Sequence, residues 1–332
     1  MKVSVVVATY NGEKYLIRQL ESIKNQSRQA DEVLICDDKS LDDTQSLVKD
    51  FIAKNDLKNW RFSVNENNQG YQKNFYNLLK EASGDLIFLS DQDDEWVTEK
   101  IERMEQIMCN NRQIQTLNSG IQLIDQDSAL FDIPAKKNFY NANFLYSEKP
   151  LQHINYFSLS DIIKRNISPG CSMCITREIR DRFINTYNFK LPHDWFLNML
   201  ASVTHDCVFL NERLLHYRVH SNNTLGVSDD WGAQSKINAF EKSRLAKISE
   251  FEQLLSSFKI ICTDYMLDDL ETTHLGNYLR ARLRFSQKQN LGSLLRLRDF
   301  AEYHETATFR GQIWDFVVAL GLKNLVYRLF KK

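Results

Sequence analysis

The stretch LIFLSDQDDEW at residues 86–96 joins an uninterrupted apolar run to four acidic residues within five positions. An apolar run of this kind, bounded by polar residues, is typical of a strand buried in a parallel sheet. Crowded carboxylates at the end of such a strand repel one another unless a cation lies between them. Asp91 and Asp93 are two positions apart, so both can reach one hard cation, Mg²⁺ or Mn²⁺. The stretch therefore predicts a metal site at a strand end, with an exposed acidic turn as the alternative.

The residues before this stretch alternate between strand and helix patterns. Val3–Ala8 is a β-branched run, and the next apolar residues recur with helical spacing. Strands that alternate with helices form a mainly parallel sheet with helices on both faces. We therefore expect a Rossmann-like α/β fold. The expected elements, strand and helix in turn, are residues 3–8, 15–23, 32–36, 43–53, 60–64, 75–82 and 85–89.

Polar residues follow three of the expected strands. These clusters are residues 9–12, 37–38 and 91–94. In parallel sheets ligands bind beyond the carboxyl ends of the strands, so the clusters are expected to meet in one crevice. There Tyr10 could stack on a base and Asp38 could accept the imide N–H of uracil or thymine. The alternative is a purely structural role for this acidic segment, in which Asp42 or Asp43 caps the next helix. Neither GxGxxG nor GxxxxGK[ST] occurs, which argues against dinucleotide oxidoreductases and P-loop phosphotransferases.

The C-terminal hundred residues have a different pattern, with apolar residues at helical spacing. The last helix is expected at residues 313–330, where Lys323 and Arg328 make the segment a poor membrane span. Residues 276–332 contain eleven Lys or Arg against four Asp or Glu. We expect this region to pack on the N-terminal domain, with contact to an anionic membrane surface as the alternative.

Composition and cysteine usage indicate a folded intracellular protein. The 332 residues are 43% hydrophobic, enough for one large α/β domain and an appendage. The N-terminal MKVSV enters a strand without a signal-like segment, and the six cysteines are scattered, so we expect a cytoplasmic protein with reduced thiols. Cys171 and Cys174 form a CxxC without a second CxxC, which favours packed residues over a zinc or redox site.

Several motifs occur in a fixed order over residues 1–225. They are VSVVVATYNG at 3–12, CDDKSLDDT at 36–44, NQG at 68–70 with Asn74, GD at 84–85 and SDQDDEW at 90–96. Each motif alone is weak, but the ordered set resembles family 2 of the bacterial glycosyltransferases, and most closely its rhamnosyltransferase branch. The resemblance implies a GT-A nucleotide-diphospho-sugar transferase fold at residues 1–228. Its nucleotide-binding half would be residues 1–95 and its acceptor half 96–228, with a C-terminal helical region at 229–332.

The resemblance also implies which residues hold the donor. Asp91 and Asp93 match the DxD pair, with Asp93 the more direct ligand of Mg²⁺ or Mn²⁺. Lys73 stands near the position where the family often has an arginine. The implied contacts to the nucleotide-sugar are Thr9, Tyr10, Asn11, Asp38, Asn68, Gly70, Lys73, Asp91, Gln92, Gly170 and Arg218.

Two later segments match the family as well. LPHDWF at residues 191–196 resembles the segment whose Asp is the catalytic base, so Asp194 is the implied base, with capping of the following helix as the alternative. Its aromatic neighbours would raise its proton affinity. HYRVHSNNT at 216–224 resembles the stretch whose Arg or His faces the pyrophosphate. His220 is thus either a metal ligand or a structural histidine.

The resemblance implies a single displacement that inverts the anomeric carbon. The implied donor is dTDP-β-L-rhamnose, and UDP-hexoses are the alternative. The implied acceptor is a saccharide, polyprenyl-linked, of a bacterial surface polysaccharide, and would bring the protein to the inner face of the plasma membrane. A homodimer is allowed, and no nucleic-acid partner is expected. Two other classes stay open: a haloacid-dehalogenase-like phosphatase, because LSDQD resembles its nucleophile motif, and a non-catalytic nucleotide-sugar-binding scaffold.

Overall fold

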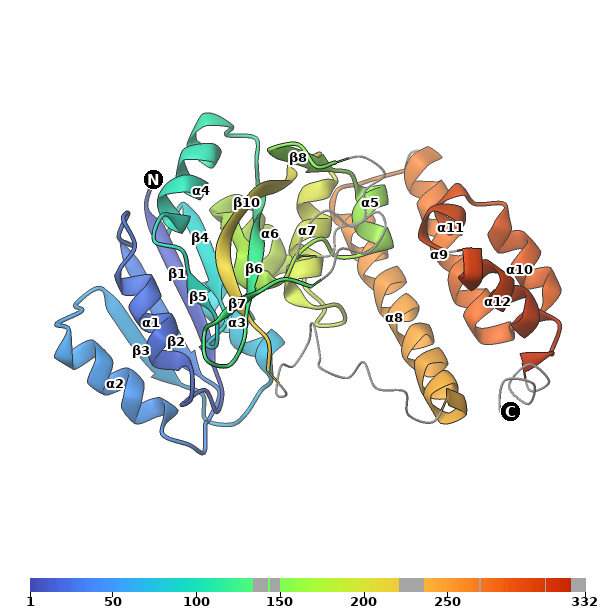
Figure 1. Ribbon diagram of the computed structural model, residues 1–332. Coiled ribbons are helices and arrows are strands. Elements are labelled where there is room, and N and C mark those ends of the chain that lie inside the picture. Colours follow the sequence, from blue (N-terminus) through green and yellow to red (C-terminus); the bar gives the residue numbers. More distant parts are fainter. Residues whose placement is uncertain (134–142, 144–149, 221–235, 269, 308, 324–332) are drawn as a thin grey trace. The chain divides into compact units, whose positions relative to one another are not determined.

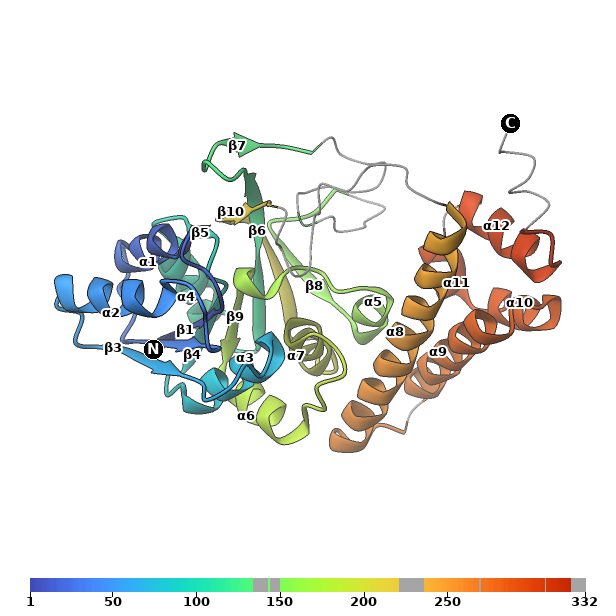
Figure 2. The same cartoon turned by 90° about the horizontal axis from the view of Figure 1, so that it is seen from below.

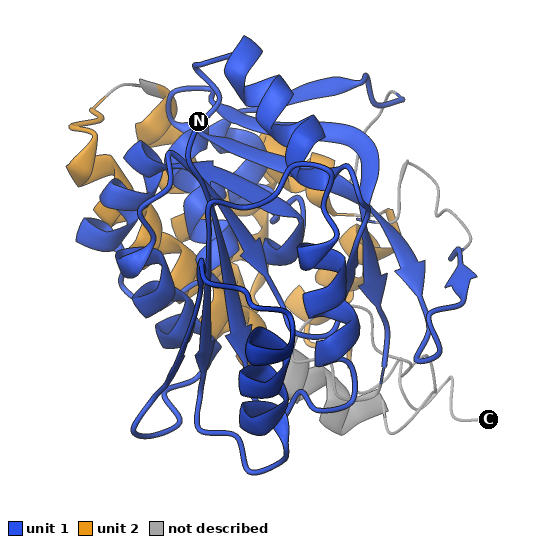
Figure 3. Cartoon of the chain, turned by 90° about the vertical axis from the view of Figure 1, so that its left-hand side faces the viewer, with its two compact units in different colours: residues 1–230 blue, residues 231–332 orange. Residues whose placement is uncertain are grey.

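A computed structural model describes the chain except for residues 134–142, 144–149, 221–235, 269, 308 and 324–332 (Figure 1). The chain divides into two compact units, Met1–Asp230 and Trp231–Lys332, which Figure 3 shows in different colours. All six cysteines are free thiols, as expected.

Unit 1 begins with the predicted alternation of strands and helices. The β-branched run forms a buried strand, and the next helix buries Leu16, Leu20 and Ile23, which share one of its faces. The elements up to the acidic cluster are β1 (Val3–Thr9), α1 (Leu16–Lys24), β2 (Glu32–Asp37), α2 (Thr44–Lys54), β3 (Trp60–Val64), α3 (Tyr71–Glu81) and β4 (Leu86–Ser90). Helix α3 begins at Tyr71, four residues before the predicted start, and Gly70 at its N-cap has a φ of 81°, which glycine adopts without strain.

The rest of unit 1 adds further strands and helices to the same sheet. These elements are β5 (Glu95–Trp96), α4 (Lys100–Asn110), β6 (Thr116–Ile124), β7 (Leu130–Phe131), β8 (Ile154–Phe157), α5 (Leu159–Lys164), the 3-10 helix η1 (Gly170–Ser172), β9 (Met173–Thr176), α6 (Arg177–Thr186), α7 (His193–Ser202) and β10 (Cys207–Arg218). Helix α5 begins with a capping box in which Ser158 and Asp161 bond each other's backbone N–H groups.

The sheet confirms the predicted α/β class. Its order is β3-β2-β1-β4-β9-β6-β10-β5, with β7 on β6 and β8 on β10. Strands β3, β2, β1 and β4 are parallel, whereas β9 is antiparallel to both β4 and β6. Helices α1, α2 and α4 cover one face of the sheet, and α3, α6 and α7 cover the other (Figure 2).

The register of the parallel strands brings the polar clusters together. Thr9 pairs with Asp37, and Val7 pairs with Ser90, the last residue of β4. The residues that follow β1, β2 and β4 therefore lie along one edge of the sheet, as expected. Below that edge the sheet is apolar, and the side chains of β1, β2 and β4 are almost entirely buried.

Unit 2 is helical, as predicted. Its helices are α8 (Lys236–Asp264), α9 (Leu270–Lys288), α10 (Leu291–Arg298), α11 (Ala301–Thr306) and α12 (Phe309–Ala319). Helices α8 and α9 pack against each other, and the buried ring of Phe258 on α8 lies beside Gly276 on α9. The predicted last helix, residues 313–330, is confirmed over residues 313–319: α12 runs from Phe309 to Ala319, and Gly321 follows with a φ of 71°, which ends it. Residues 324–330 of that prediction lie outside the described residues. Among the helices that the structure describes, none combines the length and the apolar character needed to cross a bilayer.

Candidate functional site

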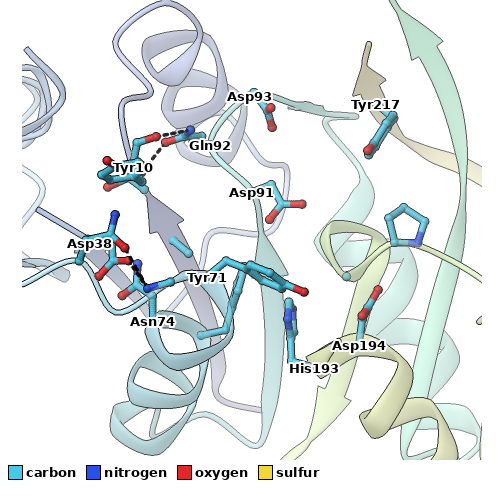
Figure 4. Close-up of a pocket in the computed structure, with 17 residues that line it drawn as sticks. Tyr10, Asp38, Tyr71, Asn74, Asp91, Gln92, Asp93, His193, Asp194 and Tyr217 are labelled. Carbon is cyan, nitrogen blue, oxygen red and sulfur yellow. Dashed lines mark hydrogen bonds between the residues drawn. The ribbon is translucent and has the colours of Figure 1, made fainter. Parts of the chain in front are cut away.

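A cavity of about 380 Å³ opens at the sheet edge where the polar clusters meet (Figure 4). This volume lies within the range of small-molecule sites. The loops after β1 and β4 form part of its wall, and the first turns of α3 and α7 form another part. Ten of the implied site residues line the cavity: Thr9, Tyr10, Asp38, Asn68, Gly70, Asp91, Gln92, Asp93, Gly170 and Asp194.

The loop after β1 is tied to the loop after β4 by Gln92. Its amide accepts a hydrogen bond from Tyr10 N at 2.8 Å and donates one to Tyr10 O at 2.9 Å. The Tyr10 side chain is exposed and free to meet a planar ligand. Asn11 lies behind this loop, where its N–H donates to Ser40 Oγ and its Oδ1 accepts from Leu41 N. Asn11 thus shapes the loop and does not line the cavity.

The carboxylate of Asp38 holds the loop that precedes α3. Its Oδ2 accepts from Gly70 N at 2.7 Å, and its Oδ1 accepts from Gln69 N at 2.9 Å and from Asn65 Nδ2 at 2.8 Å. These bonds fix the loop against the end of β2. A pyrimidine imide would have to share an oxygen that already accepts from the chain.

The acidic cluster places three carboxylates at the end of β4. Asp91 and Asp93 line the cavity (Figure 4), whereas Asp94 is buried beneath them. Oδ2 of Asp94 has no hydrogen-bond partner. Burial, followed by the charge of Asp93, raises the pKa of both Asp91 and Asp94 above the usual range. Such crowding of buried negative charge favours a cation at this point.

Two sets of side chains in this cluster could hold a divalent metal. Asp91 and Asp93 face the cavity, and His220 Nε2 lies 2.8 Å from Asp93 Oδ2. Ligand atoms of Asp91, Asp94 and Cys171 also lie within 4.8 Å of one another. The first set offers two carboxylates and an open side toward the cavity, which suits Mg²⁺ or Mn²⁺ better than a set with a soft thiol.

Arg218 lies beneath the acidic cluster and is fully buried. Its guanidinium donates to Asp93 O and Asp125 O, both at 2.7 Å, and pairs with the Glu95 carboxylate. Its backbone N–H donates to Asp94 Oδ1 at 2.9 Å. Arg218 therefore holds the loop that carries the acidic residues and does not line the cavity.

Asp194 lies in the first turn of α7, on the wall of the cavity that faces Asp91 (Figure 4). Its Oδ2 accepts from Asn166 Nδ2 and its Oδ1 from Trp195 N, both at 2.9 Å. The alternative that Asp194 caps α7 is wrong, because the N-cap is Pro192 and Asp194 is already helical. The side chain instead projects from the helix into the cavity.

Comparison with known proteins adds to this geometry. Residues 4–165 match the sequence model of Glycosyl transferase family 2. Residues 4–165 thus have the sequence pattern of a family 2 glycosyltransferase domain. The chain is 28% identical to the dTDP-rhamnosyl transferase RfbG of Shigella flexneri over 243 residues, which are 69% of this chain and 77% of that protein. It is 24% identical to WfgD of Escherichia coli, a UDP-Glc:α-D-GlcNAc-diphosphoundecaprenol β-1,3-glucosyltransferase, over 74% of this chain and 89% of that one.

Solved glycosyltransferases share the fold. A structure of S. aureus TarS residues 1–349 with UDP superposes with a TM-score of 0.56 at 18% identity, covering 92% of this chain and 77% of that one. The mannosyltransferase PcManGT of Pyrobaculum calidifontis, determined with GDP-Man and Mn²⁺, has a TM-score of 0.52 at 15% identity, covering 97% and 86%. The fold is therefore the GT-A type, which excludes the haloacid-dehalogenase-like alternative.

The glycosyltransferase cavity also contains aromatic residues that sequence reasoning missed. The His193 ring stacks on Phe75, with centroids 4.2 Å apart, and meets the edge of Tyr71 at 6.0 Å. Both ring nitrogens of His193 are buried without a hydrogen-bond partner. Burial lowers the pKa of His193, which keeps the ring neutral. The only sequence signal was its place in PHDWF, next to Asp194.

Two lysines lie where the sequence did not place them. Lys73 does not line the cavity, and its ammonium lies over the rings of Tyr76 and Phe189, at 4.7 and 5.0 Å. Lys100 was not singled out from the sequence, yet it is fully buried below the acidic cluster. It follows the apolar-acidic stretch closely, but only the fold shows that it turns inward.

Proposed function

We propose that this glycosyltransferase is metal-dependent and inverting, and that it transfers L-rhamnose from dTDP-β-L-rhamnose to a saccharide acceptor. The observation that carries the proposal is the placement of Asp194 opposite Asp91 and Asp93 in one cavity. A carboxylate on one side can take a proton from an attacking hydroxyl, while the acidic pair on the other can bind the donor's diphosphate through a metal.

In the proposed reaction the acceptor hydroxyl attacks the anomeric carbon of the donor. The C–O bond to the nucleoside diphosphate breaks as the new glycosidic bond forms, and Asp194 takes the hydroxyl proton. Asp91 and Asp93 would hold a divalent metal, which when bound would offset the negative charge of the leaving diphosphate. Tyr10 and the loop held by Asp38 surround the nucleoside, and Asn68, Gly70 and Gly170 shape the walls beside the ribose and the sugar.

The rhamnosyl donor is favoured by the similarity to RfbG, whose name gives dTDP-rhamnose as its donor. UDP-hexoses are the second candidate because WfgD and the UDP-bound TarS use or bind uridine nucleotides by name. Uracil and thymine differ by one methyl group, so a base site formed by Tyr10 and Asp38 would be expected to bind either. The GT-A domain would serve both donors with the same carboxylates.

We further propose that the acceptor is a polyprenyl-linked saccharide of a bacterial surface polysaccharide. WfgD is named for an acceptor on diphosphoundecaprenol. Such an acceptor would be reached from the cytoplasmic face of the membrane, where unit 2 offers exposed apolar side chains, such as Phe309 and Ile313 on α12, near basic ones, such as Arg310. Association with the membrane surface and a homodimer belong to this proposal.

A donor screen tests the proposal directly. Purified protein with Mn²⁺ and a polyprenyl-diphosphate-linked saccharide as acceptor is incubated with dTDP-β-L-rhamnose, UDP-glucose, UDP-GlcNAc or GDP-mannose, and released nucleoside diphosphate and glycoside products are measured. We expect dTDP release only with the rhamnosyl donor, and an α-rhamnoside by NMR of its anomeric proton. Turnover of UDP-glucose alone would replace the donor but keep the enzyme class. Turnover of GDP-mannose alone would contradict the role of Tyr10 and Asp38 as a pyrimidine site.

A further inference from the structure

Three asparagine side chains form a continuous hydrogen-bonded chain that ends on Asp194. Asn118 Nδ2 donates to Asn198 Oδ1 at 2.9 Å, and Asn198 Nδ2 donates to Asn166 Oδ1 at 3.0 Å. Asn166 Nδ2 then donates to Asp194 Oδ2 at 2.9 Å. The three residues come from β6, α7 and the loop after α5. We call these three asparagines the amide chain. None of the three lines the cavity, whereas Asp194 does.

The interior amides are committed to this chain. Asn118 and Asn198 are fully buried, so neither can exchange its partner for water. Asn118 Nδ2 also donates to Val208 O at 3.2 Å, and Asn198 Oδ1 also accepts from the Cys207 thiol at 3.4 Å. These contacts to the start of β10 anchor the far end of the chain to the central sheet.

The surroundings of Asn166 set the direction of its amide. Its Oδ1 accepts from Ile167 N and from Asn198 Nδ2, both at 3.0 Å, so donors lie on that side. Its Nδ2 donates to Ser168 O at 3.0 Å and to Asp194 Oδ2, so acceptors lie on the other side. A reversed amide would set oxygen against oxygen and nitrogen against nitrogen. The amide group of Asn166 therefore always presents N–H to Asp194.

We infer that the amide chain is a positioning device that holds the Asp194 carboxylate at the angle its reaction requires. This inference rests on the proposed role of Asp194 as the base. With Oδ2 held by Asn166 and Oδ1 held by Trp195 N, the carboxylate plane is fixed relative to α7. A base acts only when its lone pair is aligned with the proton it takes, and small misplacements of reacting groups lower rates strongly. The amide chain thus connects the Asp194 carboxylate to the rigid central sheet.

The sharpest test is Asn198→Asp, which keeps the shape of the side chain one helical turn beyond the base. A carboxylate there cannot donate to Asn166 Oδ1, so Asn166 loses one of the two donors that orient its amide and its link to the buried end of the amide chain. We expect kcat for sugar transfer to fall by about 100-fold. The dissociation constant of the donor, measured by calorimetry with a non-hydrolysed analogue or with dTDP and Mn²⁺, should change by less than about twofold.

A matched control separates positioning from general damage. Gln26 is a buried amide between α1 and α4, where Nε2 donates to Val97 O and Oε1 accepts from Ile101 N. Gln26→Glu makes the same chemical change outside the cavity and should leave kcat unchanged at temperatures where the protein is folded. If Asn198→Asp does not fold, Asn166→Ala removes the last bond from a loop position and should give the same fall in kcat.

A double variant tests whether the amide chain acts through Asp194. In an Asp194→Ala background, Asn198→Asp should cause no further loss, because the group it positions is already absent. An additional loss of the same size would overturn the inference. So would full kcat in Asn198→Asp or Asn166→Ala when Asp194→Ala retains only residual activity. Inactivity of the wild-type protein with every donor, or full activity of Asp194→Ala, would instead refute the proposed function itself.

Discussion

The Lys100 ammonium group donates a hydrogen bond to the carbonyl oxygen of Cys171 at 2.6 Å, inside the protein and below the acidic cluster. The same ammonium lies over the Trp96 ring, 4.2 Å from its centroid. Burial lowers the pKa of Lys100 to about 8, although nearby Asp94 and Asp91 act in the opposite direction. Lys100 is thus an internal cation that partly balances the carboxylates at the end of β4.

Removing this cation should destabilise the fold. Lys100→Met keeps the length of the side chain but removes one of the two buried cations beside the acidic cluster, the other being Arg218. We expect the free energy of unfolding, measured with urea, to fall by about 3–5 kcal/mol. Lys80→Met, at an exposed position of α3, is the control and should change it by less than about 0.5 kcal/mol. Equal effects of the two substitutions would show that the charge of Lys100 is not needed.

The metal site gives a graded prediction. Asp93→Asn should abolish stabilisation of the protein by Mn²⁺ with dTDP, because it removes a charged ligand that faces the cavity. His220→Ala should weaken Mn²⁺ binding by about 10–100-fold, because His220 then no longer orients the Asp93 carboxylate. Calorimetric titration of chelator-treated protein measures both. The control is Asp132→Asn, because Asp132 is an exposed residue that pairs with Arg213. Unchanged Mn²⁺ affinity in Asp93→Asn would place the metal elsewhere, with Asp91, Asp94 and Cys171 as the next set to test.

Asp194 should matter for turnover and not for donor binding. Asp194→Asn retains the size of the side chain but cannot accept the acceptor's proton, so kcat should fall by about 100-fold to 10,000-fold. The thermal shift produced by dTDP and Mn²⁺ should persist. Asp181→Asn, an exposed partner of Arg180 on α6, provides the control. Retained turnover in Asp194→Asn would mean that another group in the cavity, or solvent, takes the proton.

His193 predicts how stability depends on pH. Its pKa lies below the ordinary 6.5 in the folded protein, chiefly through burial, while neighbouring Asp194 acts in the opposite direction. The unfolded chain therefore binds a proton at His193 more readily, and stability from this group falls as pH drops below 6.5. In His193→Phe that loss is absent. As the pH falls from about 7.5 to about 5.5, the free energy of unfolding in urea should therefore decrease more for the wild type than for His193→Phe.

The outcome for His193 has a clear opposite. If the difference in stability stayed constant over that pH range, His193 would titrate alike in the folded and unfolded protein, and the unpartnered nitrogens would have found partners. Phe75 stacks on the ring and Tyr71 meets it edge-on, and Asp194 is the charged group that raises its pKa. A variant at Tyr71, such as Tyr71→Phe, should retain the wild-type pH dependence.

The sequence was sufficient where local pattern decides structure. The β-branched run at the N-terminus and the apolar run before Asp91 were predicted to be strands, and they form β1 and β4. Because these strands are parallel, their carboxyl ends meet at one edge of the sheet. The strand Met173–Thr176 was not foreseen, because insertion of an antiparallel strand between β4 and β6 depends on pairing with residues far away in the chain. Local propensity carries little information of that kind.

The site was predictable to a similar extent. Residues at strand ends, such as Tyr10 and Asp91, line the cavity because position in the strand fixes their location. Lys100 and Asn198 could not be found, since a lysine or an asparagine in a helix is exposed by default, and only tertiary packing turned these inward. The prediction for Arg218 failed for the same reason. Its motif suggested a contact to the ligand, but its guanidinium donates to backbone carbonyls and pairs with Glu95 inside the protein.

Gly170 is the position where one added methyl group should report on the cavity wall. A Cβ there would lie 2.9 Å from His193 Nε2 and 3.3 Å from Asp194 Cβ, closer than real contacts allow to the first of these. The His193 ring is held by Phe75, so the strain should displace the first turn of α7, and with it Asp194. We expect Gly170→Ala to lower kcat by about 10-fold to 100-fold, with little loss of dTDP binding. Gly292→Ala on α10 is the matched control, because its Cβ would meet only Asn290 Oδ1 at 3.8 Å and alanine favours a helix. Wild-type kcat in Gly170→Ala would show that the wall yields without moving Asp194.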